Sequence, residues 1–449
     1  MTLESKNRHL ADCRRNGFSE GATRSKAVNG PRTAYILLWF PKPSETFIFR
    51  EVVRLLDLGL PLKVYTLYGP VRQDLAPEMQ AFAGPVERLG RGFVREAPVQ
   101  LLYWLRRRRR LVLTLFRALL VKPYYGLEKT GENGWAFLAG LYLARRFAEE
   151  GIEHIHAPWA SGPATAAWVA SRLTGIPFSF NTRAWDIYPP DGALGEKIED
   201  ALFVRSETAY NIKHLSRRYR SVPTKIHLTY NGVPLTRHQE APVGMEPPYR
   251  LLALGRFVAK KGYDDLLRAC QRLAQAGLDF TLTLAGDGPR RRRLERLTRR
   301  LSLTSQVRFP GFVTYDRVPD LFREADIFVM PSVVAASGDR DGIPLVLMEA
   351  LMHRVPVVAT AVSGIPELIE DGVTGLLVPQ RNPMALAAAV TRLCLDREAA
   401  LRLAEAGRDR VLTTFSPEAN YRAVFELYRR YFPAGPGRTA QAEHGCSQD

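Results

Sequence analysis

The sequence predicts two α/β domains, each a doubly wound parallel sheet with helices on both faces, which face each other across a cleft. Short apolar runs alternate with helical stretches along most of the chain. A proline-rich, charged break at residues 234–248 interrupts this alternation, which then restarts. The 449 residues also exceed a usual single core. We therefore predict a first domain over residues 33–240 and a second over residues 241–415.

The first domain opens with a strand, a helix and a strand, and the same rhythm recurs after residue 150. The predicted strands are "TAYILLWF", "PLKVYTLYG", "IEHIHA", "IPFSFN", "ALFVRS" and "KIHLTYNGV", and the clearest helices are "ETFIFREVVRLLDLGL" and "GPATAAWVASRLTG". Because strands that alternate with helices pair in parallel, these segments predict one sheet with crossover helices.

The second domain repeats the pattern with different residues. Its predicted strands are "YRLLALGRF", "FTLTLAGDG", "QVRFPGFV", "DIFVMPS", "PVVAT" and "GLLVP", and its helices are "DDLLRACQRLAQAG", "PRRRRLERLTRRLS" and "PLVLMEALMHR". Apolar spacing predicts a closing helix over residues 416–432, which could pack back on the first domain. Residues 1–32 and 433–449 are predicted to be a disordered leader and a disordered tail.

Composition narrows the class of protein. With 46% hydrophobic and 24% charged residues, the chain has the makeup of a soluble globular protein. Four cysteines lie far apart without a CxxC pair, which indicates a reducing compartment, and the leader has no apolar core typical of a signal peptide. We therefore expect a cytoplasmic protein. The formal net charge of +17 comes without a nucleic-acid-binding motif, so no nucleic-acid partner is predicted.

One basic segment, residues 99–126, contains five consecutive arginines between Leu, Trp, Phe and Tyr residues. It is too charged to span a bilayer but suits the surface of an anionic membrane. A solvated helix face whose apolar side packs on its own domain explains the same residues. The sequence leaves both interpretations open, and we predict peripheral attachment to the inner face of the cell membrane.

Two turns of the second domain have the composition of an anion site. Gly255 ends a buried strand, and Arg256 and Lys261 follow it just before a helix starts near Gly262. Backbone amides at a helix start, together with these cations, suit a diphosphate. Solvated cations in an ordinary turn are the alternative. The turn at Gly286 follows the next strand, and a plain β-turn explains it equally well.

Carboxylates mark a further turn and helix of the same domain. Asp341 precedes the turn "GIP", and Glu349 lies two helical turns later, where it could reach the cleft. Carboxylates in this position commonly accept hydrogen bonds from ribose hydroxyls. Ser363 and Gly364 supply another turn where a phosphate could approach the backbone closely.

Taken together, "GRFVAKKGYDDLLRA", "LAGDGP", "VRFPGFV", "ADIFVMPS" and the segment from "DGIP" to "GLLVP" resemble the nucleotide-sugar-dependent glycosyltransferases of family four, which have the GT-B fold. The resemblance covers the second domain. The first domain, with "FPKPSETFIFREVVRLLDLG", "AWDIY" and "YNGV", looks like the branch that builds bacterial exopolysaccharide and lipopolysaccharide, of the colanic-acid type.

The resemblance implies roles for the donor-side residues. Arg256 and Lys261 would neutralise the donor diphosphate, and Glu349 would bind the ribose. Asp341 stands where most of the family has the first glutamate of an E-x7-E pair and would face the transferred sugar. The remaining donor-binding residues would act through backbone or shape: Gly255, Gly286, Val313 in the base-flanking segment 310–313, Gly342, Ile343, Pro344, Ser363 and Gly364.

The sharpest departure from the family pattern is Arg183, where this branch usually has histidine. Arginine cannot accept a proton at physiological pH, so we expect Arg183 to supply charge near the leaving group. A structural cation paired with Asp186 or Asp191 is the alternative. The other acceptor-side candidates are Ser44, Glu45, Thr46, His156, Asp186 and Asn231, although a helix N-cap at 44–46 and a buried structural role for His156 are equally open.

These expectations combine into one enzyme. The sequence predicts a retaining glycosyltransferase that moves a sugar from a nucleotide diphosphate sugar to a hydroxyl of a glycan or lipid-linked acceptor, in cell-surface polysaccharide biosynthesis. Arg183, Asp341, Arg256 and Lys261 are the catalytic candidates, and no metal or other cofactor is expected to be obligatory. The alternatives are a GT-B-fold nucleotide-sugar epimerase or hydrolase, and an inactive membrane-associated scaffold.

Overall fold

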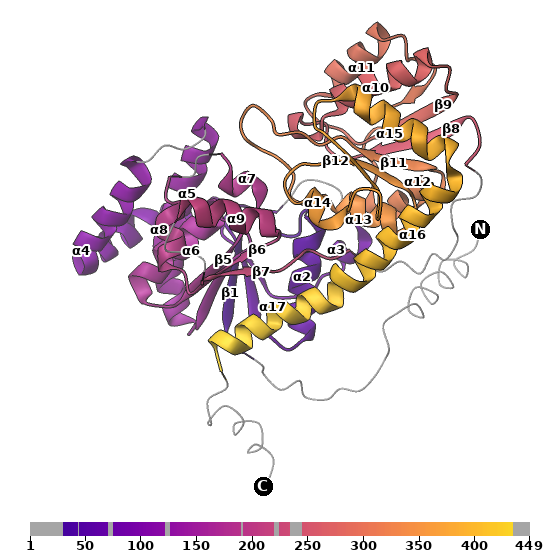
Figure 1. Ribbon diagram of the computed structural model, residues 1–449. Helices are drawn as coiled ribbons and strands as arrows, with labels where there is room; N and C mark the ends of the chain where they lie inside the picture. Colours follow the sequence, from indigo (N-terminus) through magenta and orange to yellow (C-terminus); the bar gives the residue numbers. More distant parts are fainter. Residues whose placement is uncertain are drawn as a thin grey trace, which may run out of the picture.

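The computed structural model describes residues 30–433, apart from residues 44, 71–74, 122–125, 190–191, 220–223 and 234–244. The predicted leader, the tail and most of the predicted interdomain break therefore lie outside the described residues. Two parallel β-sheets, each covered by helices, form the two halves of the molecule (Figure 1). The last strand of the first sheet ends at Leu228, and the first strand of the second sheet begins at Tyr249.

The first sheet has the order β3-β2-β1-β4-β5-β6-β7, and all its pairs are parallel. Its strands are β1 (Thr33–Leu37), β2 (Leu62–Thr66), β3 (Val86–Arg88), β4 (His154–Ala157), β5 (Phe178–Thr182), β6 (Phe203–Ser206) and β7 (Ile226–Leu228). The order changes direction between β1 and β4. Loops at the carboxyl ends of such strands are where ligands of doubly wound sheets bind.

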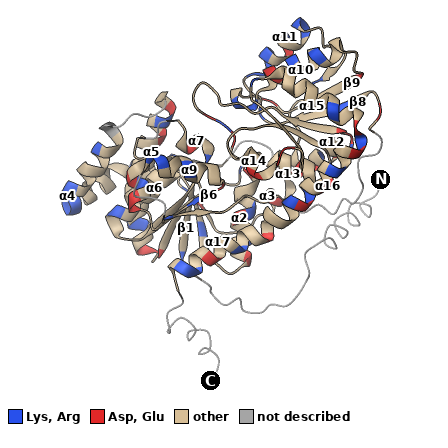
Figure 2. Ribbon diagram, viewed as in Figure 1, with Lys and Arg blue, Asp and Glu red and all other residues tan. Residues whose placement is uncertain are grey.

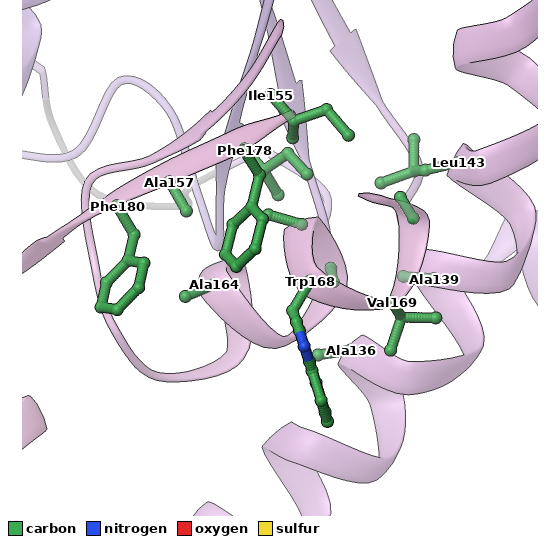
Figure 3. Packing of buried hydrophobic residues seen from close by; sticks show 14 of the residues in the cluster. Ala136, Ala139, Leu143, Ile155, Ala157, Ala164, Trp168, Val169, Phe178 and Phe180 are labelled. Atoms are coloured by element: carbon green, nitrogen blue, oxygen red, sulfur yellow. The ribbon is translucent and has the colours of Figure 1, made fainter. Parts of the chain in front are cut away.

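Helices cover both faces of this sheet. They are α2 (Thr46–Asp57), α3 (Pro77–Gln80), η1 (Gly92–Arg95), α4 (Ala97–Val121), α5 (Gly126–Glu149), α6 (Gly162–Thr174), α7 (Ala184–Ile187), α8 (Leu194–Asp200) and α9 (Ala209–Arg218). Small residues let α5 and α6 approach closely (Figure 3). A Cβ on Gly140 would lie 2.7 Å from the Val169 side chain, so this helix pair requires glycine there.

The second sheet has the order β10-β9-β8-β11-β12-β13, again with parallel pairs. Its strands are β8 (Tyr249–Leu254), β9 (Phe280–Ala285), β10 (Val307–Arg308), β11 (Ile327–Met330), β12 (Val357–Thr360) and β13 (Leu376–Val378). Its helices are η2 (Ala259–Lys261), α10 (Tyr263–Gln275), α11 (Arg291–Arg300), η3 (Tyr315–Arg317), α12 (Val318–Arg323), α13 (Leu345–Met352), α14 (Ile365–Leu368), α15 (Pro383–Leu395) and α16 (Arg397–Thr414).

The last helix, α17 (Pro417–Tyr431), follows α16 and runs along the first domain (Figure 1). Val424, Phe425 and Tyr428 are buried in an apolar cluster with side chains from α2 and β1. The end of the chain that follows the second sheet therefore covers part of the first one.

Helix α4 extends away from the rest of the first domain (Figure 1) and is kinked at Arg108. The five arginines at 106–110 lie in the middle of this helix, around its kink, and are exposed; Figure 2 shows its Lys and Arg residues in blue. Leu102, Leu113 and Phe116 on the same helix are also exposed. Among the described helices, none combines the length and the apolar composition needed to cross a membrane.

Candidate active site

The loop after β8 brings two lysines onto one buried carboxylate. Lys261 Nζ donates to Asp341 Oδ2 at 2.9 Å, and Lys260 Nζ lies 3.8 Å from Asp341 Oδ1. Ser332 Oγ donates to the same carboxylate at 2.7 Å. Burial by itself would raise the pKa of Asp341, but Lys261 and Lys260 outweigh it and hold that pKa below its usual value. The loop therefore concentrates positive charge around an ionised aspartate.

Glycines let this loop fold tightly. Gly262 has φ 66°, and a Cβ there would lie 1.8 Å from the carbonyl oxygen of Pro331. A Cβ on Gly286 would lie 2.1 Å from the carbonyl oxygen of Gly255, so the two predicted turns touch each other. Arg256 is exposed beside them, and no ion pair joins it to another described residue. Its guanidinium is thus available to an anion.

Two further turns of the second domain lie directly against the first domain. A Cβ on Gly342 would lie 2.8 Å from Glu207 Oε1, and one on Gly364 would lie 2.6 Å from Thr208 Cγ2. Ile343 and Pro344 are buried in the first of these turns. Ser363, in the second, has φ 51°, a left-handed conformation that non-glycine residues rarely adopt. Both turns therefore present backbone to the interface between the domains.

Glu349 on α13 approaches the same interface from the floor of the second domain. Removal from water raises its pKa to about 7, and Arg50 on α2 of the first domain only partly offsets this. The Arg50 guanidinium stacks 4.6 Å from the ring centroid of Tyr315. Within the described part of the chain, no hydrogen bond reaches the Glu349 carboxyl, so its acceptor oxygens are available.

The base-flanking segment predicted at 310–313 lies next to the turn at Gly286. Gly286 N donates to the carbonyl oxygen of Gly311 at 2.8 Å. Val313 is half-buried against the core, whereas the neighbouring Phe312 is exposed. The structure therefore places Val313 beside the donor-side turns.

Arg183 follows β5 and is buried in a polar cluster of the first domain. Its Nη1 donates to Glu207 Oε2 at 2.6 Å, and its Nε donates to the carbonyl oxygen of Pro158 at 3.1 Å. Asn231 Nδ2 donates to the same Glu207 oxygen at 2.5 Å. The Arg183 guanidinium lies 4.3 Å from the ring centroid of Phe47. Because Glu207 also borders Gly342, this cluster faces the second domain.

Glu207 is the residue that sequence analysis missed. Pairing of Arg183 with Asp186 or Asp191 was the alternative to a role near the leaving group. Asp186 Oδ2 accepts from Ala160 N at 2.9 Å, Asp191 lies outside the described residues, and Glu207 is a carboxylate that binds Arg183. The available signal was position, because Glu207 directly follows the end of β6, at the same sheet edge as Arg183.

The other acceptor-side candidates are placed in different surroundings. Ser44 lies outside the described residues, and Thr46 begins α2. Glu45 precedes that helix and makes no side-chain cap; its Oε1 accepts from Lys42 Nζ at 2.6 Å. His156 is fully buried in the sheet, where its Nδ1 lies 2.7 Å from Ser179 Oγ. Burial lowers the pKa of His156 well below its usual value, and the ring does not join the Arg183 cluster.

Side chains of the second domain also hold the two domains together near this site. Glu367 accepts from the backbone N–H groups of Ala209 and Tyr210 at 2.9 and 2.8 Å. Arg340 stacks over the ring of Tyr188, 4.0 Å from its centroid. These contacts keep the Arg183 cluster opposite the turns at Gly342 and Gly364. Among the described residues, no three His, Cys, Asp or Glu side chains gather into a metal-binding cluster.

Comparison with known proteins gives consistent matches. Residues 237–410 match the family model described as glycosyl transferases group 1. The "putative colanic acid biosynthesis glycosyltransferase WcaL" of Salmonella typhimurium is 28% identical over 417 residues, which cover 88% of this chain and 99% of WcaL. The "amylovoran biosynthesis glycosyltransferase AmsK" of Erwinia amylovora is 36% identical over 207 residues, 46% of this chain and 51% of AmsK.

Solved structures match over nearly the whole chain. Anabaena Alr3699/HepE in complex with UDP gives a TM-score of 0.67 at 16% identity, covering 89% of this chain and all of that one. The apo form of the lipopolysaccharide outer core galactosyltransferase WaaB gives 0.62 at 15% identity, covering 88% and 99%. At these identities the similarity concerns the fold, and it confirms the predicted GT-B architecture of two facing α/β domains.

Proposed function

The second domain of this chain belongs to the group 1 glycosyl transferases, and we propose that the protein transfers a sugar from a nucleoside diphosphate sugar to a glycan or lipid-linked acceptor in exopolysaccharide biosynthesis. The chain is a glycosyltransferase, and its donor, acceptor and pathway are the proposal. The names of WcaL and AmsK support the pathway, and the UDP complex of HepE supports the donor class.

The observation that carries the donor proposal is the convergence of Lys260 and Lys261 on Asp341, with Arg256 exposed beside them. A diphosphate that enters this loop would meet three cations and the backbone of the tight turn at Gly262. Glu349 would accept hydrogen bonds from the ribose, because its carboxyl has no hydrogen-bond partner within the described residues. Val313 and its neighbours would flank the base.

Charge stabilisation and positioning would supply the chemistry. When the bond between the sugar and the diphosphate breaks, negative charge develops on the leaving phosphate oxygen, and fixed cations lower the energy of that state. We assign this role to Arg256 and Lys261. Asp341, held between the lysines and Ser332, would orient Lys261 and border the transferred sugar. The proposal includes no obligatory metal or organic cofactor, since these side chains provide the positive charge.

Arg183 would act near the same leaving group, from the first domain. It remains a cation at physiological pH, so it cannot remove a proton from the acceptor hydroxyl. A retaining reaction on one face of the sugar lets the departing phosphate oxygen take that proton instead. Glu207 and Asn231 hold the guanidinium in place, which suits a fixed charge near the leaving group.

We further assign the exposed side of α4 to an anionic membrane surface at the cytoplasmic face. Arg106–Arg110 are solvent-exposed, and Leu102, Leu113 and Phe116 beside them are exposed apolar side chains. Each basic residue near such a surface contributes about 1 kcal/mol, and apolar side chains add to the binding. This attachment would bring the protein to lipid-linked acceptors.

Transfer can be tested with radiolabelled nucleoside diphosphate sugars incubated with and without a membrane extract that contains lipid-linked oligosaccharides. The proposal expects label in the glycan only when donor and extract are both present. Turnover of the donor without any acceptor would instead indicate an epimerase or a hydrolase. Binding of donor with no turnover under any condition would indicate an inactive scaffold.

A further inference from the structure

A cavity of about 650 Å³ lies at the carboxyl edge of the first sheet, away from the Arg183 cluster. Three aromatic side chains line it, from three different segments: Trp39 after β1, Tyr68 after β2 and Trp135 on α5. Each of these residues is partly exposed, although Trp135 also packs on the core of the first domain. Nothing in the donor site uses them.

The rings are held in a fixed arrangement. Trp39 and Tyr68 have ring centroids 4.6 Å apart, and Tyr68 stacks on Trp135 at 5.9 Å. Trp135 Nε1 donates to the carbonyl oxygen of Leu67 at 3.1 Å, and Tyr68 N donates to that of Leu38 at 3.0 Å. The sheet itself therefore positions this aromatic surface before any ligand arrives.

Glycines and polar groups complete the cavity. A Cβ on Gly69 would meet no atom within 4 Å, so space remains open there. Arg91 lines the rim and is exposed, and Lys42 Nζ lies 5.2 Å from the Trp39 ring centroid. Burial, and then the carboxylates of Glu132 and Glu128, raise the pKa of Tyr68, so its hydroxyl stays protonated and able to donate.

The cavity and the Arg183 cluster share one edge of one sheet. The cavity lies over β1, β2 and β3, whereas Arg183 and Glu207 follow β5 and β6. Two to three strand spacings separate β5 from β1 and β2, which is roughly 10–15 Å. Residues between the two places touch both of them: Lys42 lies beside Trp39 and binds Glu45, and the Arg183 guanidinium stacks on Phe47. Because the separation is this short, a chain of a few sugars could reach from the cavity to the Arg183 cluster.

We propose that this aromatic cavity binds a sugar ring of the acceptor glycan, one or more residues away from the hydroxyl that receives the new sugar. The inference rests on the proposed glycosyltransferase function and names the acceptor class, a glycan of at least two or three sugars. The apolar face of a pyranose ring stacks on aromatic side chains, while its hydroxyl groups need donors such as Arg91 and the Tyr68 hydroxyl. A cavity of flat aromatic rings bordered by such donors therefore suits a sugar ring better than a purely apolar chain.

The binding test uses a printed array of bacterial oligosaccharides as the probe, followed by calorimetry with the glycans that bind. Trp39→Ala removes one face of the cavity, and Trp39→Phe is the matched control that retains a ring. Gly69→Leu is a second variant, which fills the cavity without removing any ring, so that a loss of binding would not depend on a truncated aromatic side chain. Circular dichroism confirms that each variant is folded.

The wild-type protein is expected to bind glycans of two or more sugars more tightly than the matching monosaccharides. Trp39→Ala and Gly69→Leu should each weaken this binding by about tenfold, as expected when a buried ring contact is lost, and Trp39→Phe should retain most of it. The inference is overturned if no array glycan binds, or if both cavity variants bind glycans as the wild type does. It is also overturned if calorimetry with a prenyl phosphate, used as a lipid probe, shows that the cavity variants lose binding of this lipid instead of the glycan.

Binding of UDP and GDP to the same variants separates this inference from the proposed function. Both variants should bind nucleoside diphosphate as the wild type does, because the donor loop lies in the other domain. Failure of the wild type to bind any nucleoside diphosphate would count against the proposed function. Loss of glycan binding with intact nucleotide binding assigns the effect to the cavity.

Discussion

Ionisation of Glu349 should destabilise the folded protein above neutral pH, and Glu349→Gln should remove this effect. Burial raises the pKa of this carboxyl from 4.5 to about 7. A pKa raised on folding favours the protonated form, so the associated stability is present at low pH and is lost as pH rises through about 7. With about 1.4 kcal/mol for each pKa unit, the full effect is about 3 kcal/mol. Partial exposure of Glu349 makes this an upper value.

Thermal and chemical unfolding of wild type and Glu349→Gln across pH 5 to 8 would measure this effect. The variant should gain stability relative to the wild type by up to about 2.5 kcal/mol between those two pH values. Glu398→Gln is the control, because Glu398 is 86% exposed on α16 and should show no such trend. A difference that stays constant with pH, or a variant that is less stable at pH 8, would refute the burial argument.

The donor gives a second readout of the same residue. Since an ionised carboxylate is the stronger acceptor for ribose hydroxyls, affinity of the wild type for a nucleoside diphosphate should rise as pH increases through about 7. Glu349→Gln should bind more weakly and without this pH dependence. Equal pH profiles for the two proteins would remove Glu349 from the ribose site.

Two other predictions concern the first domain. Turnover at saturating donor should fall strongly in Arg183→Ala and be partly retained in Arg183→Lys. In Arg183→His it should appear mainly at pH values where histidine is protonated. Unchanged turnover in the alanine variant would make Arg183 a structural residue. For α4, flotation with anionic liposomes should recover the protein and weaken with salt, and replacing Arg106–Arg110 by glutamine should abolish it; equal recovery with neutral vesicles would contradict the membrane assignment.

Apolar periodicity was sufficient to predict both sheets, because buried parallel strands and amphipathic helices leave clear patterns. Strand β3 is only three residues long and contains no apolar run, so it was not predicted. Helices α5 and α15 were missed as well, since their many small residues blur the boundary between apolar and polar faces. The predicted closing helix over residues 416–432 corresponds to α17.

Residues of the candidate site could be predicted where each one belongs to a short, recognisable sequence motif. Lys261 and Asp341 were both selected from motifs, although the sequence did not indicate that they pair with each other. Glu207 was not selected, because its importance comes from long-range contacts with Arg183 and Gly342. For His156 the sequence left an acceptor-side role and a buried structural role equally open, and the fold buries the ring against Ser179.

Calorimetric titration of Lys261→Ala with a panel of nucleoside diphosphates tests the donor site most directly. Lys261 ends η2, just before α10, and donates to Asp341 at 2.9 Å. Loss of one charged hydrogen bond to a diphosphate should cost about 1.5–3 kcal/mol, or roughly 10- to 150-fold in affinity. Lys225→Ala, which removes a lysine from the opposite domain, should bind as the wild type does. Weakened binding in Lys261→Ala alone is the predicted result. Unchanged affinity in a folded Lys261→Ala protein would contradict the placement of the donor in this loop.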